Sequence, residues 1–516
     1  MSSEINTVRE LVDFAADKYG EKDFCRFVRD NEVRTKSYVQ FREDCLSVCR
    51  YIRSIRKEQL HIAFIGSTSY EYVACLTGMI FSGNVVVPFA PDISVDEAAM
   101  LFEDADIELL FCEDAFRQKA LEVQQRYHGL REIVSLGDAG WFDAIFERYK
   151  TGSFWSGLSK IKEYPDHCSL IVYTSGTTGV RKGVMLSNRN LAANTCYNEY
   201  ALESTDVSFS VLPMHHVFCY ACDVLKTLYD GGTLCLNGEM KNLYKNLLRF
   251  EPTIMRIVPA LCKSILTRIK ITQKQQPSLS PREAAERVVG KNFRRMISGS
   301  AFLSPALVDG FEEYGITVRQ GYGMSECSPR ISTSDFTDND SKYSNGKVLS
   351  VNEVRVVDGE IQVRGPSVML GYYKRQKETK EAFTTDGFLH TGDLGYLKGD
   401  HIWLTGRKKN LIILSNGENV SPEELENRFV DDGIIKEIVV TGENDRFIAG
   451  IYPDLAFAEA HSITDIEGEI QKIVDRVNLA SPSDRQISAF RLREKPFERT
   501  STGKIKRSIF YYKGSD

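Results

Sequence analysis

The chain lacks any long uninterrupted run of apolar residues, although 42% of its 516 residues are hydrophobic. Its most apolar window, residues 73–90, is broken by Gly78 and by Ser82-Gly83-Asn84. Because a membrane-spanning helix needs about 20 consecutive apolar residues, this window predicts a buried helix followed by a strand. The first residues, MSSEINTVRELVDFAADKYGEKD, lack the apolar core of a signal peptide. We therefore expect no segment that crosses a membrane.

Neither sign of charge is in large excess, because the chain has 65 Lys and Arg residues and 71 Asp and Glu residues. The net charge of −6 argues against a broadly basic surface and so against nucleic acid as a partner. Cysteines number 12, but they are scattered and none follows Cys327. A secreted disulfide framework has a denser cysteine pattern, so we expect reduced thiols and a cytoplasmic location.

Short apolar runs alternate with helical patterns through the first two thirds of the chain, and no repeat of fixed period interrupts them. Such alternation predicts parallel α/β layers. The length is too great for one core and predicts about three domain-sized units. The expected strands are 61–65, 85–89, 108–112, 170–173, 208–212, 233–236, 254–258, 296–298 and 316–319.

The pattern changes at about residue 347. Asp358-Gly359 between two apolar runs predicts a hairpin, and Gly399-Asp400 predicts a second one. From residue 411, a helix that starts near Ser421-Pro422, two strands and a later helix predict a compact α+β unit of about a hundred residues. We therefore expect an N-terminal domain over 1–406 with a β-rich subdomain at about 347–406, a hinge at 407–410 and a C-terminal domain over 411–516.

The run TSGTTGVRKG, residues 174–183, follows an expected strand. Its glycines let backbone N–H groups turn towards an anion, its hydroxyls add neutral donors, and Arg181 and Lys182 add positive charge. It has no G-x-x-x-x-G-K-[ST] spacing, so it is not a Walker A loop. Composition alone leaves two interpretations open, a phosphate-binding loop and a polar surface loop.

Further motifs follow this loop in order: 213–216 (PMHH), 321–326 (GYGMSE), 390–393 (HTGD), 406–410 (GRKKN) continuing into 415–420 (SNGENV), and 501–506 (STGKIK). Together with the loop they resemble the motifs of the adenylate-forming superfamily, which includes acyl-CoA synthetases, the adenylation domains of peptide synthetases and luciferases. The resemblance covers about residues 170–506 and is strongest to medium- or long-chain fatty acyl-CoA synthetases and their aryl relatives.

The resemblance implies an α/β fold, with a large N-terminal domain of two doubly wound subdomains plus a small β-barrel-like subdomain, and a small α+β C-terminal domain that rotates about Lys409. It also implies two half-reactions. A carboxylate attacks the α-phosphate of ATP to give an acyl-adenylate and pyrophosphate, and a thiol then displaces AMP. The implied cofactors are ATP, Mg²⁺, and CoA or the phosphopantetheine of an acyl carrier protein. Since both reactants of the first half are anionic, positioning and charge neutralisation must supply most of the catalysis.

The resemblance also implies roles for individual residues. Lys504 would bring its ammonium to the reacting carboxylate and α-phosphate, His216 would lie near the acyl pocket, and Thr178 joins them as a catalytic candidate. Glu326 would coordinate Mg²⁺, which prefers oxygen ligands. The nucleotide- and thiol-binding set is Thr174, Ser175, Gly176, Thr177, Thr178, Gly179, Lys182, Gly299, Ser300, Ala301, Gly321, Tyr322, Gly323, Ser325, Asp393, Arg407 and Gly417; here Tyr322 would face adenine, Asp393 and Arg407 the ribose, and Gly417 the pantetheine arm.

Several of these residues have plainer interpretations when they are read alone. Asp393 could cap a turn, Lys504 could be a solvated charge in a basic tail, Tyr322 could be core, and Glu326 could be a surface acid. The ordered set of motifs favours the functional interpretation for all of them together.

A competing motif is His215-His216-x-x-Cys219-x-x-Cys222, whose spacing superficially suits zinc. Its apolar surroundings, and the lack of a second Cys/His pair at finger spacing, favour instead a helix that lines the substrate cavity.

The acid and the thiol acceptor are less well defined by the sequence. Amino-acid-activating members carry an Asp just after the Pro-x-x-His segment, whereas this chain has Val217, so an α-amino acid is disfavoured. Arg330 stands where an apolar residue is expected near the acyl pocket; it could bind a second polar group of the substrate or, as we favour, pair with an acid. CoA and a carrier protein both stay open as acceptors. A non-catalytic nucleotide-binding regulator is a third possibility, which the retained Lys504 and Glu326 disfavour.

Overall fold

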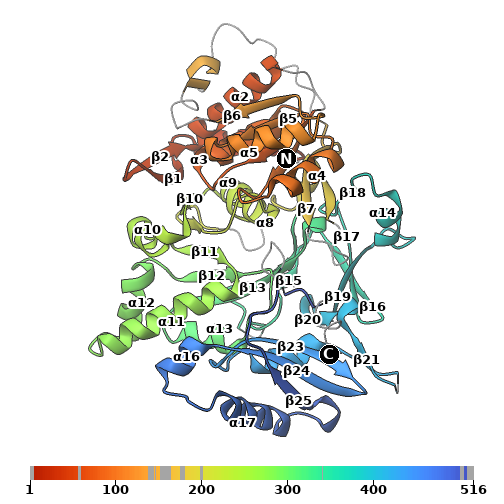
Figure 1. Ribbon diagram of the computed structural model, residues 1–516. Helices are drawn as coiled ribbons and strands as arrows, with labels where there is room; N and C mark the ends of the chain where they lie inside the picture. The colour runs from red at the N-terminus through yellow and green to blue at the C-terminus, as the bar shows by residue number, and fades with distance from the viewer. Residues whose placement is uncertain are drawn as a thin grey trace. The chain divides into compact units, whose positions relative to one another are not determined.

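The computed structural model describes residues 5–55, 60–136, 144–145, 147–150, 164–174, 181–197, 202–339, 341–415, 417–499 and 505–507. The chain forms two compact units, and its elements are labelled in Figure 1. The first unit comprises Met1–Leu303, Leu307–Val354 and Val363–Leu389, and the second comprises Ser304–Ala306, Arg355–Gln362 and His390–Asp516. The second unit therefore starts before the expected hinge, because it includes the strands that carry the HTGD and GRKK motifs. The hinge itself stays a prediction.

One sheet of the first unit has seven strands in the order β18-β8-β7-β4-β3-β5-β6. Its middle is parallel, while β8 and β18 form an antiparallel edge. The strands are β3 (His61–Ile65), β4 (Val85–Phe89), β5 (Leu109–Cys112), β6 (Glu132–Ser135), β7 (Cys168–Thr174), β8 (Lys182–Ser187) and β18 (Gly371–Tyr372). Strands β3 to β5 are almost wholly buried, which explains their continuous apolar runs.

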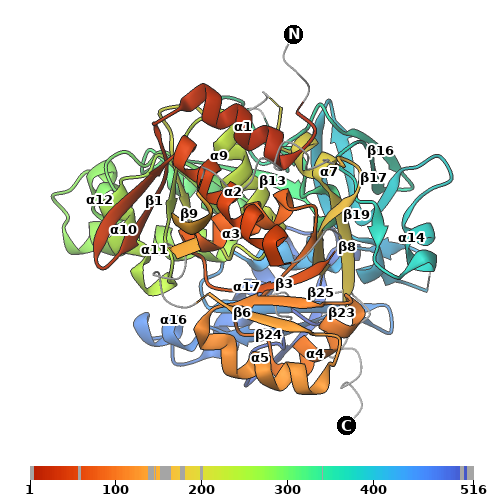
Figure 2. The same cartoon turned by 90° about the horizontal axis from the view of Figure 1, so that it is seen from above.

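Helices cover both faces of this sheet. Figure 2 shows α4 (Val95–Asp104) and α5 (Asp114–Arg126) on one face, and α2 (Tyr38–Ile55) and α3 (Tyr70–Phe81) on the other. The side chain of Ser69 caps α3 by accepting the N–H of Tyr72. The most apolar window thus forms the buried helix α3 and the strand β4, as the sequence predicted. None of the helices among the described residues is long and apolar enough to cross a membrane.

The second sheet of the first unit follows the order β15-β14-β13-β12-β11-β9-β10-β1-β2. Strands β1 and β9 to β13 run parallel, and antiparallel strands flank them on both sides. The strands are β1 (Asp23–Arg29), β2 (Glu32–Ser37), β9 (Val207–Ser210), β10 (Thr233–Leu236), β11 (Ile254–Ile257), β12 (Arg295–Ser298), β13 (Thr317–Gly323), β14 (Arg330–Thr333) and β15 (Lys347–Val348).

The core of this second sheet is built with α10 (Leu243–Phe250), α11 (Pro259–Gln275), α12 (Pro281–Val289) and α13 (Pro305–Glu312), whose apolar faces pack on β9 and β11 to β13. The first unit also contains α1 (Val8–Tyr19), α7 (Asn188–Ala193), α14 (Gln376–Ala382) and the short 3-10 helices η3 (Met240–Asn242) and η4 (Ser325–Cys327). One helical segment is irregular: α8 (Val217–Cys219) continues as the π-helix η2 (Tyr220–Leu225) and then as α9 (Lys226–Asp230).

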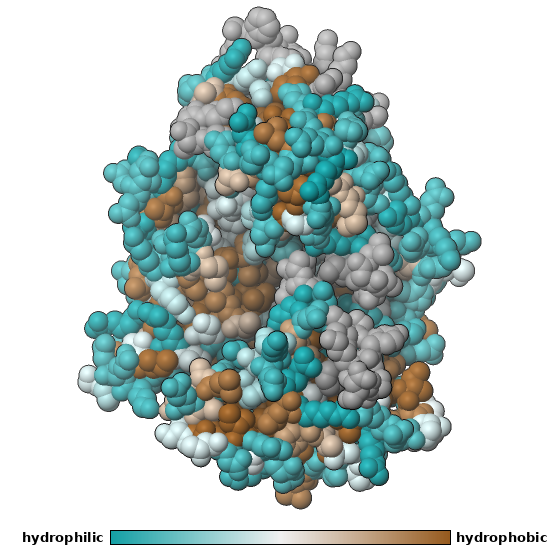
Figure 3. Space-filling model, viewed as in Figure 1, coloured by the Kyte–Doolittle hydropathy of each residue, from teal (hydrophilic) through white to brown (hydrophobic). Residues whose placement is uncertain are grey.

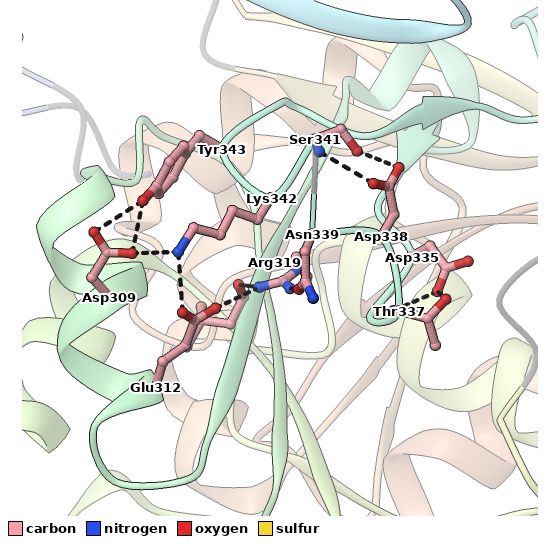
Figure 4. Close-up of polar contacts among 11 residues, drawn as sticks. Asp309, Glu312, Arg319, Asp335, Thr337, Asp338, Asn339, Ser341, Lys342 and Tyr343 are labelled. Carbon is pink, nitrogen blue, oxygen red and sulfur yellow. Dashed lines mark hydrogen bonds and ion pairs between the residues drawn. The ribbon is translucent and has the colours of Figure 1, made fainter.

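The segment between β14 and β15 is fixed to α13 and β13 by polar contacts (Figure 4). Lys342 lies between Asp309 and Glu312, at 2.7 and 3.1 Å, and the hydroxyl of Tyr343 donates to Asp309. The buried Arg319 of β13 donates to Asn339 in the same segment. These contacts hold the connection that leads from the GYGMSE motif towards β15.

The second unit begins with strands in the order β16-β17-β19-β20. Their bounds are β16 (Glu353–Val357), β17 (Glu360–Arg364), β19 (Leu389–Lys398) and β20 (His401–Arg407). The predicted hairpin turns are confirmed, because Asp358, Gly359 and Gly399 all have positive φ between paired strands.

The rest of the second unit contains a three-stranded sheet, β23-β24-β25, on which α17 packs, and a two-stranded sheet, β21-β22. Its elements are η5 (Lys408–Asn410), β21 (Ile412–Ile413), β22 (Asn419–Val420), α15 (Pro422–Glu426), η6 (Asn427–Phe429), β23 (Ile435–Glu443), β24 (Arg446–Pro453), α16 (Leu455–Ala460), α17 (Ile466–Leu479), η7 (Ser483–Arg485) and β25 (Ile487–Leu492). The predicted fold class, a large α/β part followed by a small α+β part, is confirmed.

Candidate functional site

The ends of the glycine-rich run lie on two paired strands. Thr174 ends β7, Lys182 begins β8, and the two residues are register partners. Ser175, Gly176, Thr177, Thr178 and Gly179 lie outside the described residues, so their predicted contacts with phosphate stay predictions. The described ends show that the run connects two adjacent antiparallel strands, the first of which the sequence predicted.

A tyrosine connects the strand end of the loop to the expected metal ligand. The hydroxyl of Tyr372 donates to Oε1 of Glu326 at 3.0 Å, and Nζ of Lys182 lies 4.7 Å from the centre of the Tyr372 ring. Glu326 is 8% exposed, and its backbone carbonyl accepts the N–H of Met369. Burial, reinforced by the charge of Glu326, raises the pKa of Tyr372, so its hydroxyl remains a donor at neutral pH. A lysine, a phenol and a carboxylate are thus held together in the first unit.

The glycines expected around adenine mark close approaches of the backbone. A Cβ on Gly299 would lie 3.3 Å from the ring of Phe218 and 3.7 Å from the carbonyl oxygen of Gly321, which brings α8, β12 and β13 together. A Cβ on Gly323 would lie 1.9 Å from the carbonyl oxygen of Pro329, so only glycine fits there. Next to Gly299, Ser300 has a φ of +71° and is exposed.

The remaining members of this set differ in exposure. Ala301 is exposed, Ser325 is partly buried in η4, and Tyr322 of β13 is buried. The burial of Tyr322 agrees with both interpretations of that residue, core and adenine wall, so its role stays a prediction.

The two adjacent histidines precede α8 and are partly buried. Their rings lie 4.2 Å apart. Burial lowers the pKa of His215 to about 3, with help from His216 and Arg181, and burial also lowers the pKa of His216. Both imidazoles are therefore neutral at pH 7, and each can donate or accept one hydrogen bond without adding charge.

Buried charges lie on and beside the helical segment that follows these histidines. Asp223 lies 3.3 Å from Arg256 and accepts the hydroxyl of Ser210. One turn further on, Lys226 lies 2.9 Å from Asp230. Burial raises the pKa of Asp223 to about 6 and lowers the pKa of Lys226 to about 8, although the ion-pair partners oppose both shifts. Two buried ion pairs therefore hold this segment where it departs from regular α-helix.

Arg330 is buried on β14 and uses its donors on the end of α7. Its Nε donates to Oδ1 of Asn194 at 3.2 Å and its Nη2 to the backbone carbonyl of Asn194 at 2.5 Å. Its guanidinium also lies 5.0 Å from the centre of the Tyr197 ring. Among the described residues no carboxylate forms an ion pair with it, so the favoured pairing with an acid is not found there. A guanidinium on the last carbonyls of a helix is a stabilising arrangement in its own right.

In the second unit, Asp393 and Arg407 are register partners on β19 and β20, and Nε of Arg407 donates to Oδ1 of Asp393 at 2.5 Å. Asp393 is therefore a strand residue rather than a cap. Beside them, the buried Glu360 accepts the N–H of Gly392 at 3.0 Å and lies 3.0 Å from Lys408. Burial opposes ionisation of Glu360, but Lys408, Gly392 and His390 outweigh it and keep the pKa of Glu360 below its usual value.

Three predicted residues of the second unit concern movement and the second half-reaction. Lys409 lies exposed in η5, directly after the Asp393–Arg407 strand pair. Gly417 is exposed with a φ of +83°, and a Cβ there would meet nothing within 4 Å. Lys504 lies outside the described residues, next to the described stretch 505–507.

Sequence reasoning missed Tyr372, Glu360 and Asn194 as supports of the site. Each is polar, buried or partly buried, and bonded to a motif residue or its neighbour that is remote in sequence, so no local spacing signals it. Within the described ranges, no three His, Cys, Asp or Glu residues are grouped closely enough to hold a metal ion by themselves.

Comparison with known proteins assigns the family. Residues 12–373 match the family described as AMP-binding enzyme, and residues 409–514 match the AMP-binding enzyme C-terminal domain. This chain belongs to the AMP-binding enzyme family. The predicted resemblance to adenylate-forming enzymes is thereby confirmed.

Relatives of this AMP-binding enzyme include long-chain-fatty-acid–CoA ligase FadD15 of Mycobacterium bovis, 27% identical over 87% of this chain and 85% of that protein. The peroxisomal long chain acyl-CoA synthetase 6 of Arabidopsis thaliana is 28% identical over 81% of this chain and 67% of that protein. Among solved structures, the anthranilate CoA ligase AuaEII in complex with anthranoyl-AMP shares the fold with a TM-score of 0.81, at 17% identity over 99% of this chain and 97% of that one.

Proposed function

We propose that this AMP-binding enzyme joins a carboxylic acid to the thiol of CoA at the expense of ATP. The substrate carboxylate attacks the α-phosphate, the bond to the β-phosphate breaks, and pyrophosphate leaves. The thiol sulfur then attacks the carbonyl carbon of the acyl-adenylate, and AMP leaves with the oxygen that linked it to the acyl group. The observation that carries this proposal is the arrangement of Lys182, Tyr372 and Glu326 beside the ends of the glycine-rich run.

That arrangement suits a polyphosphate in the first half-reaction. Lys182 supplies a positive charge where β- and γ-phosphates would lie, and the run that it ends supplies backbone and hydroxyl donors. His215 and His216 are neutral at pH 7, so they add no charge of their own to the acyl pocket beside which His216 is proposed to lie. On the second unit, the Asp393 carboxylate can accept both ribose hydroxyls while Arg407 holds it in place.

Glu326 fits a bound Mg²⁺. Its carboxylate is oriented by Tyr372, and Mg²⁺ is commonly held by one or two carboxylates together with substrate phosphates and water. When bound, the ion would neutralise phosphate charge. Glu326 would contribute a buried carboxylate oxygen that Tyr372 orients, which agrees with that mode of binding.

A fatty acid is the substrate that we favour. Two of the relatives named above are long-chain fatty acid–CoA ligases or synthetases. In addition, hydrophobic residues gather on the first unit over β11 and β12, in the brown recess of Figure 3, and the segment α8–η2–α9 is largely apolar. An aryl acid is the alternative class. We also propose a cytoplasmic location, which the 12 cysteines support because none forms a disulfide.

A panel of carboxylic acids tests the function through acid-dependent ATP–pyrophosphate exchange. We expect exchange with fatty acids of medium or long chain, and AMP release when CoA is added. Release of AMP with a phosphopantetheinylated carrier protein but not with CoA would favour the carrier-loading alternative. If no acid in the panel supports exchange, the protein is a nucleotide-binding regulator and our proposal is wrong.

Lys504 is the residue that we propose for the first half-reaction. We expect Lys504→Ala to abolish exchange while largely sparing thioester formation from a pre-made acyl-adenylate. An equal loss of rate in the two half-reactions would contradict this division of labour. We also propose that a hinge movement at Lys409 separates the two half-reactions and that the pantetheine arm enters beside Gly417.

A further inference from the structure

The chain segment on either side of Lys504 is held to the second unit at two points. Arg499 and Ile505 form an antiparallel bridge, and the N–H of Lys506 donates to the carbonyl of Glu498 at 2.8 Å. The five residues between the bridge partners, 500–504, lie outside the described residues. Arg499 and Ile505, the residues on either side of this segment, pair with each other, so both ends of the segment that contains Lys504 are held at one place.

The first attachment lies before the lysine. Glu437 of β23 has a side chain that is 6% exposed; its Oε2 accepts the N–H of Phe497 at 2.7 Å, and its Oε1 accepts Nη2 of Arg499 at 2.6 Å. Phe497 is itself buried. A single buried carboxylate therefore binds both the backbone and a side chain of the segment that leads to Lys504.

The second attachment lies after the lysine. Arg507 binds Glu426, the last residue of α15, through both of its terminal guanidinium nitrogens. Nη1 donates to Oε1 at 2.6 Å, and Nη2 donates to Oε2. The same Oε1 accepts the N–H of Val440 at 2.7 Å, which locks the carboxylate in place. Bidentate, charge-assisted pairs of this kind are strong and directional. Burial raises the pKa of Glu426 to about 7 although Arg507 opposes the shift, which reflects how deeply this carboxylate lies.

Both carboxylates are buried, and an acid is rarely buried unless it is paired. A tail that only needed to be attached would be held by its apolar contacts, such as Phe497. Here two arginine–glutamate pairs, each with a buried carboxylate, lie on opposite sides of one lysine in the sequence, five positions before it and three after it.

We propose that the pairs Arg499–Glu437 and Arg507–Glu426 are positioning pairs that aim Lys504 for acyl-adenylate formation. The inference rests on the proposed function, in which Lys504 serves the first half-reaction. The four residues touch neither substrate nor nucleotide in this account, and they act by fixing the two ends of the lysine segment. Their loss therefore affects the first half-reaction and leaves the second one intact.

The test compares Arg507→Gln and Arg499→Gln with a matched control, Arg491→Gln. Arg491 forms an equally close bidentate pair with Glu443, both contacts at 2.7 Å, but this pair is exposed and lies on β25 and β23, away from the lysine segment. We expect Arg507→Gln and Arg499→Gln to lower kcat for acid-dependent pyrophosphate exchange about tenfold to a hundredfold, since small misplacements of a catalytic group have effects of that size. KM for acid and ATP, and thioester formation from a pre-made adenylate, should stay within twofold of the wild type.

Arg507→Lys guards against a variant that fails to fold, because it keeps the charge but loses the bidentate geometry. We expect it to fold and to show a smaller fall confined to the first half-reaction. If all the arginine variants lose both half-reactions in proportion to folded protein, or behave like Arg491→Gln, the positioning role is overturned. Lys504→Ala is measured in parallel. If this variant retains pyrophosphate exchange, the proposed role of Lys504 is wrong. If it abolishes exchange while the Arg499 and Arg507 variants match the Arg491→Gln control, only the present inference is wrong.

Discussion

Replacing Tyr372 with Phe removes one hydroxyl and keeps the ring that Lys182 contacts. That hydroxyl is a hydrogen-bond donor to Glu326, at 3.0 Å, so the variant leaves the buried carboxylate with one fixed partner fewer. A hydrogen bond to a charged group contributes about 1.5–3 kcal/mol. Loss of a partner that orients a metal ligand lowers metal affinity or activity by about 10- to 100-fold. We therefore expect the Mg²⁺ concentration that gives half-maximal pyrophosphate exchange to rise about tenfold or more.

The neighbouring tyrosine provides the control for this variant. Tyr373 also donates to a carboxylate, Oδ2 of Asp106 at 2.7 Å, but that acid is not part of the candidate site. Titrating Mg²⁺ at saturating ATP and acid should shift the curve for Tyr372→Phe and leave the curve for Tyr373→Phe unchanged. If the two variants titrate alike, Tyr372 does not orient a metal ligand and the assignment of Glu326 loses its structural support.

Three more changes test contacts within the first unit. Burial lowers the pKa of Lys226 to about 8 in the folded protein, against 10.5 for the free side chain, so the folded state binds fewer protons between these values. The cost of keeping Lys226 charged in its buried site is therefore relieved as pH rises from about 8 to 10.5. The unfolding free energy of the wild type relative to Lys226→Met, from urea denaturation, should therefore increase over that range by up to about 3 kcal/mol; a flat or falling difference would contradict the shift. Arg330→Leu should reduce stability by about 1–3 kcal/mol, because the backbone carbonyl of Asn194 loses its donor. Its KM for a fatty acid should change less than twofold, and a new preference among mono- and dicarboxylic acids would instead assign Arg330 to the substrate. Gly323→Ala must displace the backbone near Pro329, where a Cβ would lie 1.9 Å from a carbonyl oxygen; we expect loss of exchange activity with the lowest melting temperature of the set, and a fully active protein would be inconsistent with the close approach.

The layered α/β fold could be predicted because its central strands are buried on both faces. Predicted strands 61–65, 85–89 and 233–236 coincide with β3, β4 and β10, whose residues are nearly all buried and whose apolar runs are continuous. Strands β1 and β2 were missed. In β2, four of the six residues are exposed, and Val33 is the one apolar residue among charged and polar ones. The segment therefore has no buried-strand signal, and its extended conformation depends on pairing with β1.

The motifs of the site could be recognised from sequence, but the contacts that hold them could not. Tyr372 and Glu326 are 46 positions apart, and they meet because β18 pairs with β8 and the N–H of Met369 donates to the backbone carbonyl of Glu326. Likewise, the strand β13 runs further than predicted, through the motif glycines to Gly323, because β14 pairs with it there. The π-helical turn was also unpredictable, since its apolar pattern is that of an ordinary buried helix.

The most direct test of the account follows the oxygen atoms of the acid. The acid is labelled with ¹⁸O in its carboxylate, incubated with ATP, Mg²⁺ and CoA, and the nucleotide product is analysed by mass spectrometry. Attack of the carboxylate on the α-phosphate, followed by thiolysis at the carbonyl carbon, leaves one labelled oxygen in AMP and none in pyrophosphate. Recovery of the label in inorganic phosphate with ADP, or AMP without label, would contradict acyl-adenylate formation by this protein.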